Sequence, residues 1–203
     1  MDTTTHANEL QRLILEANKI MESGQLEEAL RALARVGELA TDLGEWDTAI
    51  RAHQITAEAF HQGGNLGAAF SHAAEGLYLS LEHAPDQVLP ALGQILAFME
   101  KAIAERRYYV AEEVGPGLLR ELEHLTPAEG AEVWRDLARE LAIVIMLVGD
   151  AKGDEEHPSF VEALTRAALV DRGTKGRLNL NMWVHSTAIR AEKVTDGQNS
   201  VAP

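Results

Sequence analysis

The sequence contains no cysteine, only 5% aromatic residues and no long apolar run. The absence of cysteine excludes disulfide frameworks, thiolate metal sites and cysteine nucleophiles, and it weakly favours a reducing compartment. The longest near-continuous apolar stretch, Leu141 to Val148, falls far short of the roughly 20 residues that a membrane-spanning helix needs. The first residues form neither a basic region nor an apolar run, so we expect no signal peptide. These absences predict a soluble, cytoplasmic protein.

Basic residues are also scarce, since 18 Lys and Arg stand against 32 Asp and Glu, for a net charge of −14. An acidic chain repels phosphate backbones and anionic lipids, so nucleic acid and membranes are not expected as partners. Residues 172–203 carry five basic and two acidic residues, whereas residues 1–171 carry 13 basic and 30 acidic ones. The simpler interpretation is a solvated acidic body with an ordinary tail. The alternative is that the C-terminal segment docks on this body, or that the body attracts a basic partner.

Among the residues that are present, the most informative are three copies of one pattern, spaced 20 residues apart. Each copy holds a glycine, a large apolar residue two positions later, an alanine five positions later and another apolar residue. The copies are Gly24, Leu26, Ala29 and Leu30; Gly44, Trp46, Ala49 and Ile50; and Gly64, Leu66, Ala69 and Phe70. A fixed period indicates stacked repeats. We expect glycine to make each turn, alanine to allow close helix packing, and the large residue to plug the junction.

Apolar residues recur at helical spacing along most of the chain, and no segment alternates like a strand, so the sequence predicts an all-α fold. Four helices are expected between residues 9 and 84, after a flexible N-terminus at residues 1–8. Residues 85–191 should form further helices or a helical cap, and residues 192–203 a disordered tail. The expected later helices cover residues 86–106, 108–125, from the Thr126-Pro127 cap through 141–148, from a capping box at Ser159 to about 170, and 178–191. Gly115-Pro116-Gly117 should kink or split its helix, and residues 149–158 should form an acidic loop.

The glycine pattern resembles the inter-helix junction of the tetratricopeptide repeat over about residues 9–83, in a variant of roughly 40 residues rather than the common form of about 34. The resemblance implies an α-solenoid of antiparallel helix pairs, in which the first helix of each pair lines a concave groove. The groove-facing residues would be Gln11, Ile14, Asn18, Met21 and Glu22 on the first helix, and Arg51, Gln54, Glu58, His61 and Gln62 on the third. Ile14 stands where family members that clamp a terminal carboxylate use lysine, so recognition of a terminal carboxylate is not expected, and a mixed polar groove for an internal peptide segment remains open. The alternative is that these residues are solvated or covered by the C-terminal helices.

Several polar clusters in the sequence are candidates for metal-binding or phosphate-binding sites. Glu58 with His61 and Glu121 with His124 have the spacing of di-metal ligands, but both pairs lie in the last turn before a helix break, which favours coincidence. The acidic residues from Asp150 to His157 lack the pattern of a calcium loop, and Gly173 to Gly176 lacks the spacing of a phosphate loop. His53 and His72 are interpreted as core or seam histidines, and Tyr108, Tyr109 and Trp183 as packing residues rather than partner anchors.

The function expected from the sequence is a non-catalytic adaptor, scaffold or small chaperone that holds a peptide or partner helix in the groove, with no cofactor and no metal. Its partner would be a protein or peptide, and a basic one would suit the charge. The first alternative is a self-assembling module that pairs with a second copy through residues 141–148 or the last helix. The second is a helical di-metal enzyme using Glu58, His61, Glu121 and His124.

Overall fold

A computed structural model of the chain describes residues 3–178 and residue 180, and every regular element among them is helical. The chain forms two compact units. Unit 1 comprises Met1–Phe98 with Leu125–Trp134, and unit 2 comprises Met99–His124 with Arg135–Pro203. The all-α prediction is therefore confirmed over the described residues.

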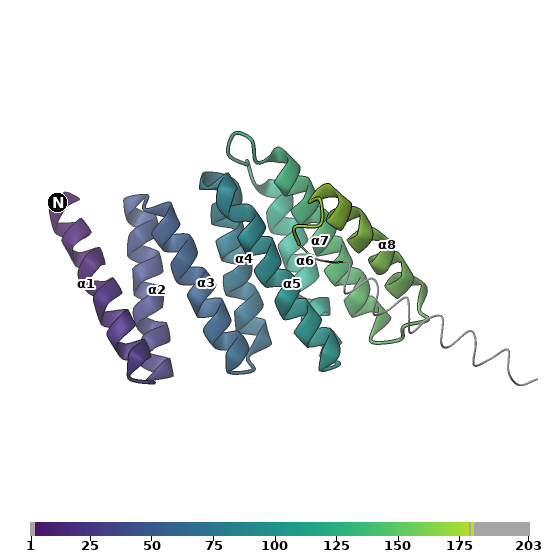
Figure 1. Cartoon of the computed structure of the whole chain (residues 1–203), viewed down its shortest axis with the longest axis horizontal. Coiled ribbons are helices and arrows are strands. Elements are labelled where there is room, and N and C mark those ends of the chain that lie inside the picture. Colours follow the sequence, from purple (N-terminus) through teal and green to yellow (C-terminus); the bar gives the residue numbers. More distant parts are fainter. Residues whose placement is uncertain (1–2, 179, 181–203) are drawn as a thin grey trace, which may run out of the picture. The chain divides into compact units, whose positions relative to one another are not determined.

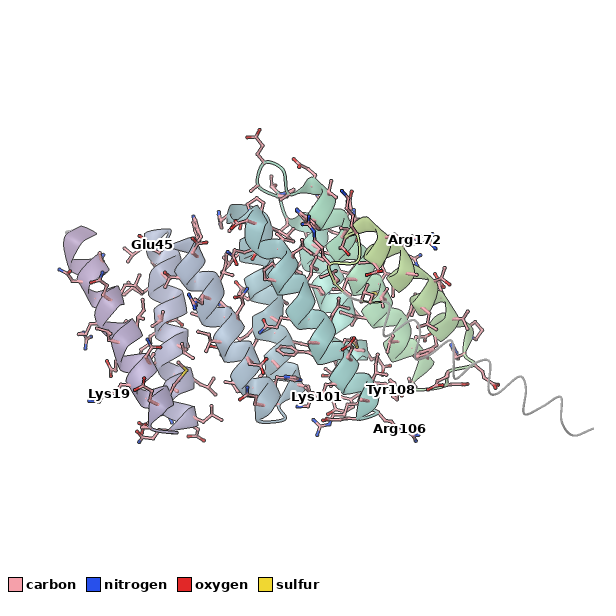
Figure 2. All side chains as sticks on the ribbon, in the orientation of Figure 1. Lys19, Glu45, Lys101, Arg106, Tyr108 and Arg172 are labelled. Atoms are coloured by element: carbon pink, nitrogen blue, oxygen red, sulfur yellow. The ribbon has the colours of Figure 1, made fainter. Side chains whose placement is uncertain are left out.

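Unit 1 is built from helices that pack in chain order. They are α1 (Thr3–Glu22), α2 (Leu26–Leu43), α3 (Trp46–Gln62) and α4 (Leu66–His83), followed by the 3-10 turn η1 (Pro85–Gln87) and the first part of α5 (Val88–Ala104). Figure 1 shows these helices running alternately up and down beside one another. Glu45, before α3, and Lys19, near the end of α1, consequently lie at opposite ends of the helices (Figure 2). The first helix begins at Thr3, before its predicted start at residue 9.

The glycine and alanine roles predicted from the repeated pattern are confirmed. Gly24, Gly44 and Gly64 have φ angles of 76°, 71° and 79°, the left-handed conformation that only glycine adopts without a steric penalty. The matching alanines, Ala29, Ala49 and Ala69, are at most 1% exposed. A small side chain at this point lets neighbouring helices approach closely, so the 20-residue period is also a period of helix contacts.

The large residue of the pattern behaves differently in each copy, so its predicted role as a plug is wrong for the first. Leu66 is 2% exposed and fills its junction, whereas Leu26 is 49% exposed. Trp46 is half-buried and stacks on His83 of α4, with 3.6 Å between ring centroids. Leu26 follows the first helix of the chain, and the side chains packed beside it do not enclose it.

Only the third copy of the pattern has a helix cap from a side chain. Asn65 Oδ1 accepts a hydrogen bond from the backbone N–H of Ala68 at 3.2 Å, while Glu45 makes no such bond to α3. We expect Asn65→Ala to lower the free energy of unfolding by about 1 kcal/mol, because an N-terminal amide of α4 loses its acceptor. Urea unfolding followed by circular dichroism measures this, with Glu45→Ala as the uncapped control. Equal losses in the two variants would contradict the assignment.

Unit 2 contains α6 (Tyr108–His124), most of α7 (Glu132–Ala151) and α8 (Pro158–Gly173). Gly115-Pro116-Gly117 was expected to kink or split its helix; a split is wrong, because α6 continues through Pro116. Proline removes one helical hydrogen bond, but the residues around it, Gly115, Leu118 and Leu122, are buried. We infer that this packing outweighs the lost bond.

Glycines place the backbones of α6 and α7 in direct contact. A Cβ atom added to Gly149 of α7 would lie 2.5 Å from the backbone nitrogen of Glu112, and one added to Gly115 of α6 would lie 2.9 Å from that of Met146. Residue numbers rise on one helix as they fall on the other, so the helices are antiparallel. The apolar stretch 141–148 lies at this contact and has no exposed residue, as predicted.

Two predicted helix starts are wrong. Residues 125–131 are a loop and α7 begins at Glu132, so Thr126 and Pro127 do not open a helix. In this loop the backbone N–H of Ala128 donates to Leu81 O of α4 at 2.8 Å, a long-range bond that ties the loop to α4. The cap of α8 is His157 rather than Ser159, because Pro158 occupies the first helical position. Residue 149 still belongs to α7, which shortens the predicted acidic loop.

The predicted last helix at 178–191, Trp183 and the predicted tail at 192–203 lie outside the described residues except for residues 178 and 180. None of the helices within the described part of the chain is long and apolar enough to cross a membrane.

Candidate functional site

The candidate site is a groove in unit 1 between α1 and α3, with α2 as its floor. It consists of two cavities that share Arg51 and Ile55. The central cavity, of about 380 Å³, is lined by Ile14, Ala17, Asn18, Leu33, Val36, Asp47, Thr48, Arg51, Ala52 and Ile55. The turn cavity, of about 460 Å³, is lined by Met21, Gly24, Leu26, Ala29, Arg51, Gln54, Ile55, Glu58, Ala59 and Gln62. We call the pair the α1–α3 groove.

Most of the residues predicted to face a groove line these two cavities. Ile14, Asn18 and Met21 come from α1, where they are three or four residues apart and therefore share one face of the helix. Arg51, Gln54, Glu58 and Gln62 have the same spacing on α3. The structure thus brings together on one surface two helix faces that the sequence could connect only through a family resemblance.

Three of the predicted residues line neither cavity. Gln11 and Glu22 are exposed on α1 away from the groove. The His61 side chain is only 15% exposed and packs against Phe98 of α5, with 4.2 Å between ring centroids. His61 therefore contributes to the α3–α5 contact rather than to the groove surface.

Sequence reasoning missed the floor of the groove. Leu33 and Val36 of α2, together with Ala29, belong to the apolar stripe of this helix, and they are buried at 1–5% exposure. They nevertheless form the apolar base of the cavities because no side chain of α1 or α3 covers them completely. No sequence signal distinguishes a core residue at the base of a groove from one at the centre of a helix bundle.

Polar groups surround this apolar floor. The Glu58 carboxylate accepts a hydrogen bond from Gln62 Nε2 at 3.0 Å, and His61 Nδ1 lies 3.8 Å from its other oxygen. The side-chain Nε2 of Gln54 is buried and has no hydrogen-bond acceptor within the described structure. An unpaired buried amide is costly, so this side chain adds a local energetic penalty beside the turn cavity. The groove therefore offers apolar contact and a carboxylate held by a neighbouring side chain.

The metal-site alternative has no geometric support. Among the described residues, no three His, Asp or Glu side chains come together closely enough to hold a metal ion. Glu58 and His61 lie on α3 in unit 1, while Glu121 and His124 lie on α6 in unit 2. In the acidic loop, Asp154 Oδ1 accepts from the N–H of Glu156 at 3.0 Å, and Asp150 accepts from Ser159 Oγ at 2.7 Å, as in an ordinary turn and helix start.

His53, His72, Tyr108 and Tyr109 do not line the groove, and their surroundings test the roles predicted for them. His53 Nδ1 and His72 Nδ1 are 3.1 Å apart on α3 and α4, within hydrogen-bond distance, which confirms the interpretation of these residues as seam histidines. Tyr108 packs beside Gly153 in unit 2, whereas Tyr109 is 57% exposed, so the packing interpretation holds for the first tyrosine only. Figure 2 shows Tyr108 near Arg106, where α5 leads into α6.

Comparisons of the chain with protein-family models, with curated protein sequences and with solved structures gave no match.

Proposed function

We propose that the protein is a non-catalytic protein-binding module, built from repeats similar to the tetratricopeptide repeat, and that it holds a peptide segment or partner helix in the α1–α3 groove. The observation that carries this proposal is the convergence of two helix faces on a continuous groove whose floor is apolar. Apolar concavities with a few placed polar groups are the usual form of binding sites. An amphipathic segment fits such a groove with its apolar side down.

The chemistry of the groove favours a basic amphipathic segment. Its apolar side would contact Ile14, Met21 and Ile55, which are half-buried and lack full cover. Its basic residues would lie near the exposed carboxylates of Asp47 and Glu58, within a chain whose net charge is −14. Arg51, between the two cavities, is positioned to donate to backbone carbonyls of the segment. Complementary charge raises the association rate and sets the orientation of the segment.

Three labelled peptides of equal length test the proposal by fluorescence anisotropy: a Leu/Lys amphipathic helix, a Leu/Glu counterpart and a Ser/Lys sequence without apolar residues. We expect binding of the Leu/Lys peptide alone, because the other two lack either the basic or the apolar component. Equal binding of the Leu/Lys and Ser/Lys peptides would show attraction by charge alone and would contradict a groove mechanism.

Two pairs of matched variants then locate the binding. Glu58→Lys should weaken binding of the Leu/Lys peptide by about tenfold. Glu28→Lys makes the same change of charge at an exposed position of α2 outside both cavities, and it should have little effect on binding. Ile14→Glu should likewise weaken binding, and Leu15→Glu, at a neighbouring residue that is 69% exposed, should not. If members of each pair behave alike while all variants keep the helical circular dichroism spectrum, the peptide binds elsewhere.

A further inference from the structure

One face of α8 in unit 2 presents apolar side chains to solvent. Val161 is 54% exposed and Leu169 is 55% exposed, and they lie about two helical turns apart. Thr165, midway between them, is exposed as well, so the three residues follow one line along the helix. Apolar exposure that recurs along one face of a helix is typical of an interaction surface.

A cavity of about 570 Å³ lies beside one end of this line, between α7 and α8. The two helices lie side by side (Figure 1), and a salt bridge of 2.8 Å joins Arg166 to α7. The apolar wall of the cavity consists of Leu137 from α7 with Leu169 and Val170 from α8. These α8 residues lie toward the C-terminal end of the helix, whereas Val161 lies near its N-terminal end. The same helix therefore carries an exposed apolar side chain at one end and an apolar cavity at the other.

The two ends of α8 also differ in charge. The turn before the helix is acidic, whereas the last turn and the segment after it are basic. The exposed charged residues are Asp154, Glu155 and Glu156 before the helix, and Arg172, Lys175 and Arg177 at and after its end. Such a surface is complementary to itself when a second copy is turned around, because each end then meets the opposite end.

We propose that unit 2 pairs with unit 2 of a second copy of the chain, with the two α8 helices antiparallel and a two-fold axis beside Thr165. Residues equally far from Thr165 on either side then face each other, so Val161 of one copy meets Leu169 of the other. Val161 thereby enters the α7–α8 cavity of the second copy, and the two-fold symmetry produces this contact twice. The acidic turn of each copy lies near the basic end of the other, which favours the antiparallel orientation.

This pairing goes beyond peptide binding and uses no residue of the α1–α3 groove, which belongs to unit 1. A single helix pair with its flanking turns buries less surface than the roughly 1,200 Å² of a standard stable interface. The dimer should therefore be weak, and its fraction should rise with concentration.

Sedimentation equilibrium of the full chain tests the pairing. Between about 5 and about 500 µM, a range that covers weak protein pairs, the mean mass should rise from that of the monomer toward that of the dimer. Leu169→Asp should remain monomeric, whereas Leu15→Asp, at an exposed residue of α1, should dimerise like the parent. A strict monomer over the whole range, or a dimer that Leu169→Asp leaves unchanged, would overturn the proposal.

The absence of native cysteine allows the position of the axis to be tested by crosslinking. The thiols of Thr165→Cys would face each other across the axis, so mild oxidation should link two chains at least about tenfold faster than for Glu113→Cys, which is exposed on α6. Non-reducing electrophoresis measures both rates. Equal rates in the two variants would show that the copies do not meet at Thr165.

Two further cysteine variants test the orientation. Val161→Cys and Leu169→Cys should link to each other when mixed, but each alone should link slowly, because antiparallel helices hold the identical residues about 12 Å apart along the helix axis. Chains of two lengths distinguish the products on the gel. Linkage of Val161→Cys to itself as fast as to Leu169→Cys would rule out the antiparallel register.

Charge reversal gives a measurement that needs no new covalent bond. Lys175→Glu and Glu156→Lys should each weaken dimerisation by about fivefold, and the variant that carries both changes should recover it, because the two charges are exchanged. Circular dichroism checks that every variant keeps its helices. If the combined variant dimerises more weakly than either single one, the acidic and basic ends do not meet, and the proposed pairing is wrong.

Discussion

Replacing Gly149 by alanine is expected to lower the free energy of unfolding of unit 2 by about 3 kcal/mol, because the added methyl group overpacks a helix contact. The new Cβ atom would lie 2.5 Å from the nitrogen and 2.6 Å from the Cα atom of Glu112. These are backbone atoms of α6, so no side-chain rotation relieves the clash. The helices must separate, and Leu118, Leu141 and Ile145, all at most 2% exposed, would lose part of their packing. Urea unfolding of the purified variant measures the loss.

Gly76→Ala is the matched control, since Gly76 is also buried within a helix. A Cβ atom there would meet the Cβ atom of His53 at 3.7 Å and the carbonyl of Ile50 at 3.8 Å, which are ordinary contacts. The higher helix propensity of alanine should make this variant as stable as the parent, or more stable by up to about 1 kcal/mol. A large loss in Gly76→Ala, or none in Gly149→Ala, would contradict the close approach of α6 and α7.

The fold of unit 1 could be predicted largely from local signals. Gly24, Gly44 and Gly64 mark turns because their backbone conformation disfavours other residues, and Ala29, Ala49 and Ala69 mark contacts that leave no space for larger side chains. Each signal acts within one turn or one helix contact, so it can be recognised in a single sequence. The seven residues predicted to face the groove that do line the cavities follow from the same helical spacing.

The helix boundaries that were predicted wrongly depend on contacts between residues that are distant in sequence. Thr126 and Pro127 have the composition of a helix start, yet Ala128 bonds to Leu81 of α4, and the helix begins later. Pro116 has the composition of a helix break, yet α6 continues through it, with Gly115, Leu118 and Leu122 buried around it. Similarly, Leu33 and Val36 form the floor of the groove only because α1 and α3 leave space above them. No local pattern contains this information.

Lowering the pH from 7.5 to 5 is expected to reduce the free energy of unfolding of unit 1 by about 2 kcal/mol through His53. Burial, with a smaller contribution from the neighbouring His72, lowers the pKa of His53 from 6.5 to about 4, and burial also lowers the pKa of His72. Between these values the unfolded chain binds a proton that the folded chain does not. Stability is therefore complete above pH 6.5 and declines as the pH falls toward 4. Urea unfolding at a series of pH values measures the slope.

The contact between the two rings explains why the folded state resists protonation. With His53 Nδ1 and His72 Nδ1 3.1 Å apart, one neutral ring can donate to the other, whereas two protonated nitrogens would face each other without an acceptor. His53→Leu should therefore flatten the stability profile between pH 7.5 and 5. His124→Gln removes an exposed histidine on α6 and should leave the slope unchanged. If the free energy of unfolding of His53→Leu still falls between pH 7.5 and 5 as in the parent, other groups cause the pH dependence. If the decline is lost, the α3–α4 seam is the acid-sensitive contact of unit 1, which also carries the groove.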